Sequence, residues 1–248
     1  MNANAIVGGK SETGYYSAGW MHVWYKNQTT GETTYGLCSA TLISKHALLT
    51  SADCLSQWGV PVAVYFGTDT SAPVVSAQGD YAALKNVYQA SDWNYNGDIG
   101  LVFFENEINM PGDAYVLPVI DAALDSSDVH LSGLAIGYGR SVCLFDRTQG
   151  TKHSTLLAIS SVDEDTFTWN YDKNGYGSAG DGDSGGAVVY VDPTKGPIIM
   201  GVILGVGESA GSDLCRGETI ASNVGAYRGW IEDEMELHHN GVQFLPVP

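Results

Sequence analysis

The segment most able to do chemistry is residues 180–186, which read Gly-Asp-Gly-Asp-Ser-Gly-Gly. Glycine tolerates the positive φ angles and the close backbone approach that a tight turn requires. Such a turn would present the hydroxyl of Ser184, and the N–H groups of Gly182 and Ser184 could stabilise a developing oxyanion. The pattern predicts a serine nucleophile. A glycine-rich hairpin with an incidental serine is the simpler alternative.

The elements that must position this turn are mostly short strands. With 248 residues, 31 of them glycine, and only 16% charged, the chain suits an all-β protein of one large or two smaller domains. Apolar or alternating runs between turn residues predict strands at 21–26, 36–44, 46–50, 62–66, 84–88, 101–104, 130–136, 156–162, 166–170, 187–191, 198–206 and 219–224. The one convincing helix is expected at 226–238, where Trp230, Ile231 and Met235 share a face. This order of elements favours a sandwich or barrel.

Charge and cysteine usage limit the partners and the compartment. The net charge is −17, so neither nucleic acid nor an anionic membrane is expected to bind. None of the four cysteines (Cys38, Cys54, Cys143 and Cys215) forms a C-x-x-C pair, so no zinc site or other metal site is expected. An even number of cysteines favours two disulfides and an oxidising compartment, against the alternative of four reduced thiols. We expect a trimmed form of a protein secreted to the extracellular space or the periplasm.

Five motifs follow one another in a recognisable order. They are Ile-Val-Gly-Gly at 6–9, Cys-Ser-Ala-Thr-Leu-Ile at 38–43, Leu-Thr-Ser-Ala-Asp-Cys at 49–54, Asp-Ile-Gly-Leu at 98–101 and Gly-Asp-Ser-Gly-Gly at 182–186. With the terminal helix, they resemble the chymotrypsin/trypsin family of serine endopeptidases. The resemblance implies two six-stranded antiparallel β-barrels, at 6–115 and 116–225, with a helix at 226–240 packed on them. It also implies a monomer without a cofactor, whose substrate or binding partner is a peptide or protein.

The resemblance assigns catalytic roles and shows one departure. Ser184 matches the nucleophile, Gly182 and Ser184 match the oxyanion-hole donors, and Asp98 matches the carboxylate that orients the general base. The base itself should be a histidine just before the second cysteine, and this sequence has Asp53 there. Aspartate is a weak base at pH 7 because its reference pKa is about 3.9.

Asp53 is also shorter than histidine and would lie near the like-charged Asp98. Losing a triad histidine lowers kcat by about 10⁶ in a related catalytic system, so we expect a nearly inert protease. The pair Asp53 and Asp98 could alternatively hold a cation. Among the six histidines, His153 lies in a polar loop that could approach the active-site cleft, which the resemblance places between the two barrels. A surface or core role for this histidine is the simpler interpretation.

The resemblance also implies an activation pair and a specificity pocket. A freed amine at Ile6 would pair with Asp183, so an uncut chain is expected to have a poorly formed, zymogen-like oxyanion hole. Ser178 would form the neutral pocket base, with Val206 and Thr219 on its walls, as in elastase-like enzymes that prefer small apolar residues. Residues 204–206 read Leu-Gly-Val in place of the family's Ser-Trp-Gly, which puts peptide binding in doubt. The implied disulfides are Cys38–Cys54 and Cys143–Cys215.

Two hypotheses of different class follow from these features. The first is a secreted serine endopeptidase whose base was changed to Asp53, by engineering or in a natural relative. The second is a natural pseudoprotease that binds or regulates a partner. The altered segment 204–206 favours the second, because a designed knockout would leave it intact.

Overall fold

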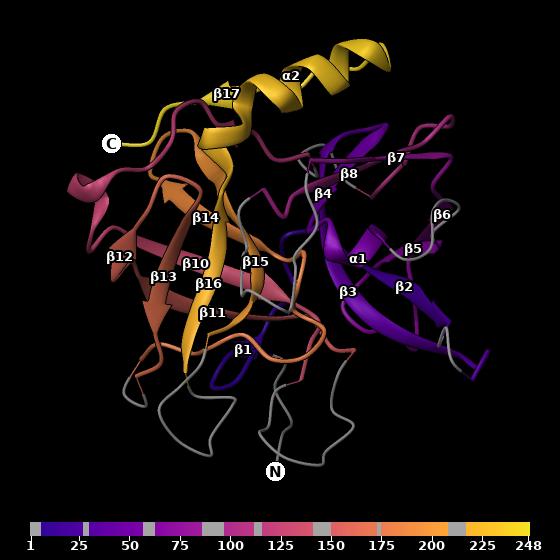
Figure 1. Cartoon of the computed structure of the whole chain (residues 1–248), viewed down its shortest axis with the longest axis horizontal. Helices are drawn as coiled ribbons and strands as arrows, with labels where there is room; N and C mark the ends of the chain where they lie inside the picture. The colour runs from indigo at the N-terminus through magenta and orange to yellow at the C-terminus, as the bar shows by residue number, and fades with distance from the viewer. Residues whose placement is uncertain are drawn as a thin grey trace.

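The chain folds into two β-sheets that lie side by side, with helix α2 (Arg228–Leu237) running along the top of both (Figure 1). The computed structural model describes residues 6–26, 30–56, 63–85, 97–111, 116–140, 150–172, 175–207 and 217–248. The expected all-β, chymotrypsin-like double-barrel class is confirmed. Within the described residues the sheets contain seven and ten strands rather than six each, and the larger sheet includes four strands of only two residues.

The first sheet is antiparallel and has the order β6-β5-β2-β3-β4-β8-β7. Its strands are β2 (Ala18–Lys26), β3 (Thr33–Ser44), β4 (Ala47–Thr50), β5 (Ala63–Phe66), β6 (Val75–Gln78), β7 (Tyr81–Leu84) and β8 (Gly100–Phe103). Side chains alternate between the two faces of a strand, so one apolar set from each strand fills the interior. Met21, Leu42, Leu48 and Phe66 belong to this buried cluster. The short helix α1 (Asp53–Ser56) follows β4.

The second sheet has the order β1-β11-β10-β14-β15-β16-β13-β12, with β9 pairing to β15 and β17. Its strands are β1 (Lys10–Ser11), β9 (Val119–Ile120), β10 (Ser132–Gly137), β11 (His153–Ala158), β12 (Ser161–Val162), β13 (Thr166–Asn170), β14 (Ala187–Asp192), β15 (Gly196–Val206), β16 (Glu218–Asn223) and β17 (Phe244–Leu245). The pairing of β1 with β11 holds the N-terminal segment on this sheet, ahead of the first sheet in sequence. That placement brings the start of the described chain towards the turn that carries Ser184.

Most of the predicted strands lie within one to three residues of observed ones. The run at 156–162 is divided into β11 and β12, and most of the run at 84–88 falls outside the described residues. The predicted helix begins at Arg228, because Val224–Tyr227 form the 3-10 turn η2; another 3-10 turn, η1, spans Ser126–Asp128. Ile231 and Met235 are buried on the inner face of α2, as predicted. No helix in the described part of the chain is both long and apolar enough to cross a membrane.

A buried lysine anchors the segment that follows Ile6. Lys152 is only 1% exposed. Its ammonium donates hydrogen bonds to the carbonyl oxygens of Gly14 and Tyr15, while its own carbonyl accepts the N–H of Glu12 at 2.9 Å. Burial lowers the pKa of Lys152 to about 8, against the attraction of the Glu12 carboxylate. The N-terminal segment is therefore fastened by a charged group as well as by the β1–β11 pairing.

This burial makes stability depend on pH in the alkaline range. Above pH 8 the folded protein loses the Lys152 proton, whereas the unfolded chain retains it up to the ordinary lysine pKa of 10.5, so the free energy of unfolding should rise with pH. We expect a rise of at most about 1.4 kcal/mol per pH unit between about pH 8 and 9.5. Urea unfolding at several pH values measures it. Lys152→Met should abolish the rise and Lys195→Met, on an exposed lysine, should retain it; equal slopes in the two variants would contradict the assignment.

Candidate active site

The turn that carries Ser184 has the backbone that its glycines predict. Gly182 has a φ of 99° and Gly185 a φ of 84°, both in the region that favours glycine. A Cβ atom on Gly185 would lie 2.1 Å from the carbonyl oxygen of Ser39 and 2.1 Å from the hydroxyl oxygen of Thr50. The turn therefore fits against β3 and β4 only because residue 185 has no side chain.

Gly185→Ala is expected to destabilise the fold by about 3 kcal/mol or more, because it combines a positive φ with an overlap against backbone. Gly196→Ala is the matched control. Gly196 has a similar φ of 82°, and a Cβ there would meet no atom within 4 Å. Its substitution should cost only about 1 kcal/mol. Chemical denaturation of the two variants measures the difference; equal losses would show that the contact with β3 is unimportant.

Ser39 holds the turn that carries Ser184 on the first sheet. It is 1% exposed, its backbone N–H donates to the carbonyl of Ser184 at 2.8 Å, and its hydroxyl donates to the carbonyl of Gly182 at 2.9 Å. The same hydroxyl accepts the N–H of Tyr138 at 3.0 Å. Sequence reasoning did not single out Ser39 as a site residue. The only hint in the sequence was the position of this serine beside Cys38. Its role depends on contacts with residues more than 90 positions away in sequence.

The Ser184 hydroxyl is not directed at a base. It donates a hydrogen bond to the carbonyl oxygen of Leu204, on β15, at 2.9 Å. The backbone N–H groups of Gly182 and Ser184 have no hydrogen-bond acceptor within the described residues. The two candidate oxyanion donors thus have no acceptor there, while the hydroxyl of the candidate nucleophile Ser184 bonds to a main-chain oxygen that cannot remove its proton.

Asp53 and Asp98 form a close pair of carboxylates. The backbone N–H of Asp53 donates to Oδ1 of Asp98 at 2.8 Å, and the hydroxyl of Ser51 donates to Oδ1 of Asp53 at 2.6 Å. Asp98 is only 1% exposed; burial and the charge of Asp53 raise its pKa to about 7. Burial also raises the pKa of Asp53, opposed by hydrogen bonds from Ser51 and from the N–H of Cys54. Near neutral pH the pair therefore retains a proton, which makes it a poor acceptor for another.

The segment that bears Asp53 is adjacent to the nucleophile turn. Sγ of Cys54 lies 3.7 Å from the carbonyl oxygen of Ser184. The Cys38–Cys54 disulfide that the resemblance implied is formed. Cys143 and Cys215 lie outside the described residues, so their pairing stays a prediction.

Ile6 and Asp183 are brought together although the chain continues before Ile6. We expected that an uncut chain cannot form the ion pair between them, and the poorly formed oxyanion hole stays a prediction. Ile6 is fully buried, and its backbone N–H hydrogen bonds to Asp183. The Asp183 carboxylate also accepts the N–H groups of Gly139 and Gly180, each at 2.8 Å. Burial raises its pKa to about 7, opposed by these hydrogen bonds. An amide thus stands where a freed ammonium would form an ion pair.

This arrangement strains the backbone at Ile6. Its φ is 53°, a conformation that a β-branched residue adopts only under constraint. The angle φ is defined across the peptide bond from residue 5, so cutting that bond would remove the constraint. A chain that begins at Ile6 could therefore bury this side chain with less backbone strain.

The three predicted pocket residues come from three neighbouring segments: Val206 ends β15, Thr219 lies near the start of β16, and Ser178 forms an isolated bridge with Val7. Ser178 is fully buried, and its backbone exchanges two hydrogen bonds with Val7, at 2.9 and 3.1 Å. The hydroxyl of Thr219 accepts the N–H of Ala179 at 3.0 Å, and Thr219 pairs with Val206 across β15 and β16. No charged side chain is among these three.

Two histidines, His153 and His46, could be considered as substitute bases, but both make hydrogen bonds to residues other than Ser184. His153 is fully buried at the start of β11; its ring nitrogens lie 2.8 Å from the carbonyl of Thr151 and 3.2 Å from the hydroxyl of Ser11. Burial lowers its pKa. His46 lies 3.0 Å from the carbonyl of Phe104 through Nδ1. These contacts give neither ring a route to Ser184.

The motifs that build this site match a known family of proteins. The model of the Trypsin family matches residues 6–231, which is nearly the whole chain. The comparison with curated proteins gave no match. The matched range includes Ser184, Asp98 and the position of Asp53. The chain therefore belongs to the trypsin family.

Proposed function

We propose that this protein is a trypsin-like serine endopeptidase with Ser184 as its nucleophile, and that its catalysis is nearly abolished because Asp53 occupies the position of the general base. The observation that carries the proposal is the Ser184 hydroxyl, which donates to the carbonyl of Leu204 at 2.9 Å rather than to a base. A serine hydroxyl attacks a carbonyl carbon only when a neighbour accepts its proton. The chain provides the nucleophile and lacks the efficient acceptor.

The proposed chemistry is acyl transfer. Ser184 would attack the scissile carbonyl, and the unoccupied N–H groups of Gly182 and Ser184 would stabilise the tetrahedral oxyanion. The base would then return the proton to the leaving amine. Imidazole suits both transfers because its pKa is near neutrality, whereas a carboxylate pair that shares a proton suits neither.

The preferred substrate would present a small apolar residue, such as alanine or valine, before the scissile bond. Ser178 supplies no charge to select lysine or arginine, and Val206 and Thr219 narrow the pocket walls. The Cys38–Cys54 disulfide supports an oxidising location, extracellular or periplasmic. The net charge of −17 disfavours nucleic acid and anionic membranes as partners. We propose a monomer that acts without a cofactor.

A second candidate function is a pseudoprotease that binds or regulates a protein. Two observations favour it: Asp53 replaces the base, and the segment at 204–206 lacks the aromatic residue of the family. In addition, the Leu204 carbonyl already accepts a hydrogen bond from the Ser184 hydroxyl. Leu204 lies on the strand that would pair with the backbone of a substrate.

One experiment separates the two functions. Asp53→His, in a chain cut to begin at Ile6, should cleave peptides after alanine or valine if the scaffold is a protease that lacks only its base. A correctly folded and correctly cut variant without peptidase activity would instead support the binding function.

A further inference from the structure

A pocket of about 360 Å³ lies between the first sheet and the end of α2, apart from the residues of the active site. The residues that matter for its chemistry are Asp80, Tyr81, Phe103, Glu105, His238 and His239. Its size falls within the range of small-ligand sites, which is about 300–1,000 Å³. We propose that it binds a guanidinium group, presented by an arginine side chain of a peptide or protein partner.

The charge of the pocket favours a cation. Asp80 and Glu105 contribute two carboxylates, and neither lysine nor arginine is among its described lining residues. One oxygen of Asp80 accepts the N–H of Glu105 at 2.7 Å, which holds Asp80 in place. The Glu105 side chain is exposed and makes no hydrogen bond or ion pair with the residues that the structure describes. A carboxylate in this state can accept a charge-assisted hydrogen bond without breaking another contact.

One wall of the pocket is built of stacked rings. The His238 ring stacks on Phe103 with centroids 4.1 Å apart and lies 4.4 Å from the ring of Tyr81. Phe103 is buried, whereas Tyr81 is 44% exposed and offers ring surface to a ligand. A planar guanidinium stacks on such rings and can present its N–H groups to a carboxylate at the same time. The ammonium of lysine is compact and strongly hydrated, so it stacks poorly on the rings. Arginine therefore fits the pocket better than lysine.

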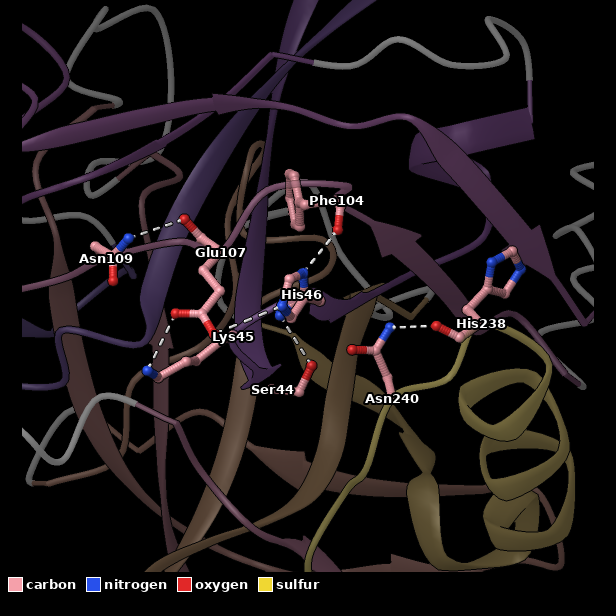
Figure 2. A network of polar contacts seen from close by, with 8 residues as sticks. All are labelled: Ser44, Lys45, His46, Phe104, Glu107, Asn109, His238 and Asn240. Carbon is pink, nitrogen blue, oxygen red and sulfur yellow. Dashed lines mark hydrogen bonds and ion pairs between the residues drawn. The ribbon is translucent and has the colours of Figure 1, made fainter.

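The end of helix α2 adds to the negative potential. His238 and Asn240 follow the last helical residue, Leu237, and line the pocket together with His46, in the turn between β3 and β4, and Phe104, which follows β8 (Figure 2). The C-terminus of a helix carries a partial negative charge, which favours a cation nearby. Nδ2 of Asn240 donates to the carbonyl of His238 at 3.1 Å, and this hydrogen bond holds the turn that follows α2.

A metal ion fits these residues less well than an organic cation. Within the described residues, no three histidine, cysteine, aspartate or glutamate side chains converge closely enough to hold a metal. His46 makes its contacts with the carbonyl of Phe104 at 3.0 Å and with Glu107 at 3.9 Å, on the side of the Lys45–Glu107 ion pair. The carboxylates and rings of this pocket are therefore better suited to a planar organic cation than to a metal ion.

The test is a titration of the intact protein with Nα-acetyl-arginine amide, followed by NMR shifts of the Tyr81 and His238 rings. We expect saturation with a Kd of about 1–10 mM, since a single side chain provides few contacts. Nα-acetyl-citrulline amide has nearly the same shape without the charge, and it should bind at least about 10-fold more weakly. The lysine analogue should bind about 3-fold more weakly than arginine because it stacks less well.

Variants assign the effect to this pocket. Glu105→Gln should weaken arginine binding about 5-fold, and Tyr81→Leu about 3-fold. Glu164→Gln removes an equal charge from the exposed turn between β12 and β13 and should leave the Kd unchanged. The proposal is overturned if citrulline or lysine binds as well as arginine, if no saturable shift occurs at these rings, or if Glu164→Gln weakens binding as much as Glu105→Gln. The ligand comparison needs no variant, so a folding defect in a variant cannot obscure the result.

Discussion

Replacing Asp53 with histidine, in a chain that begins at Ile6, is expected to raise kcat/KM for peptides with alanine or valine before the scissile bond by about 10³-fold or more. The gain comes from a base whose pKa is near neutrality, in place of a carboxylate pair that already shares a proton. Peptide cleavage assays measure it. The expected gain is below the roughly 10⁶-fold value of a triad histidine because residues 204–206 also depart from the family.

The backbone at position 53 is already held in the geometry that this prediction requires. Asp98 accepts the N–H of residue 53 at 2.8 Å, and this bond does not depend on the side chain there. A histidine on the same backbone is longer than aspartate, so it can extend from Asp98 towards Ser184. Removing the Asp53 carboxylate also removes one of the causes that raise the pKa of Asp98. Asp98 would then be ionised and able to orient the imidazole.

Three controls make the result specific. Asp53→Asn removes the carboxylate without supplying a base and should remain inert. Ser184→Ala, added to Asp53→His, should abolish the gained activity. The gained activity should rise with pH through about 6.5–7, as the imidazole loses its proton. Activity that survives Ser184→Ala, or none at all in a folded chain with a verified N-terminus, would contradict the assignment of these residues.

Cutting the chain before Ile6 is expected to increase its stability at pH 7 by about 2–4 kcal/mol. In the uncut chain the Asp183 carboxylate is fully buried beside an amide, and burial raises its pKa from 3.8 to about 7. A freed amine at Ile6 would be an ammonium next to this carboxylate, which lowers its pKa again. The cut also removes the peptide bond that constrains φ at Ile6.

The pH dependence identifies Asp183 as the cause. A carboxyl group with a raised pKa in the folded state keeps its proton to about pH 7, whereas the unfolded chain loses that proton near 3.8. Its contribution to stability is therefore complete below pH 4 and is lost as the pH rises to 7. The uncut chain should lose stability over this range, and the cut chain should lose less. Asp53 and Asp98 contribute the same trend to both chains, so the difference between the chains isolates Asp183.

Guanidinium denaturation of both chains at about pH 4, 5.5 and 7 gives the required free energies of unfolding. The matched control is the cut chain with its N-terminal amine acetylated, which has the same length without the charge. It should behave like the uncut chain. Asp183→Asn in the uncut chain should flatten the pH dependence; an unchanged slope in that variant would show that another group is responsible.

Local patterns were sufficient for the parts of the fold that depend on neighbouring residues. Most of the strands appear within a few residues of their predicted places, because alternating or continuous apolar runs between glycine-rich turns leave few other ways to bury side chains. The buried face of α2 was predicted from Ile231 and Met235 for the same reason. Short strands such as β1, β9 and β17 were missed, since two-residue pairings depend on what lies opposite them.

The candidate site was predictable only as a set of residues. Motifs located Ser184, Asp98 and Asp53, yet spacing along the chain could not reveal that the Ser184 hydroxyl donates to Leu204 or that Ser39 holds the turn from the other sheet. The prediction for Ile6 concerned the missing ion pair and did not consider the amide N–H. In the structure the apolar side chain of Ile6 is buried and its amide N–H bonds to Asp183 without any charge on the nitrogen.

Residue identities and their local spacing were sufficient to indicate the trypsin family, to predict Ser184 as the nucleophile and to show that position 53 is not a histidine. The raised pKa values of Asp53, Asp98 and Asp183 could not be read from the sequence, because a pKa shift requires burial and neighbours that are remote in sequence. The tertiary structure likewise created the pocket beside α2, where Asp80, Phe103 and His238 meet from three separate segments. Both the raised pKa values and the pocket arise from packing between residues that are far apart in sequence, which local sequence patterns do not encode.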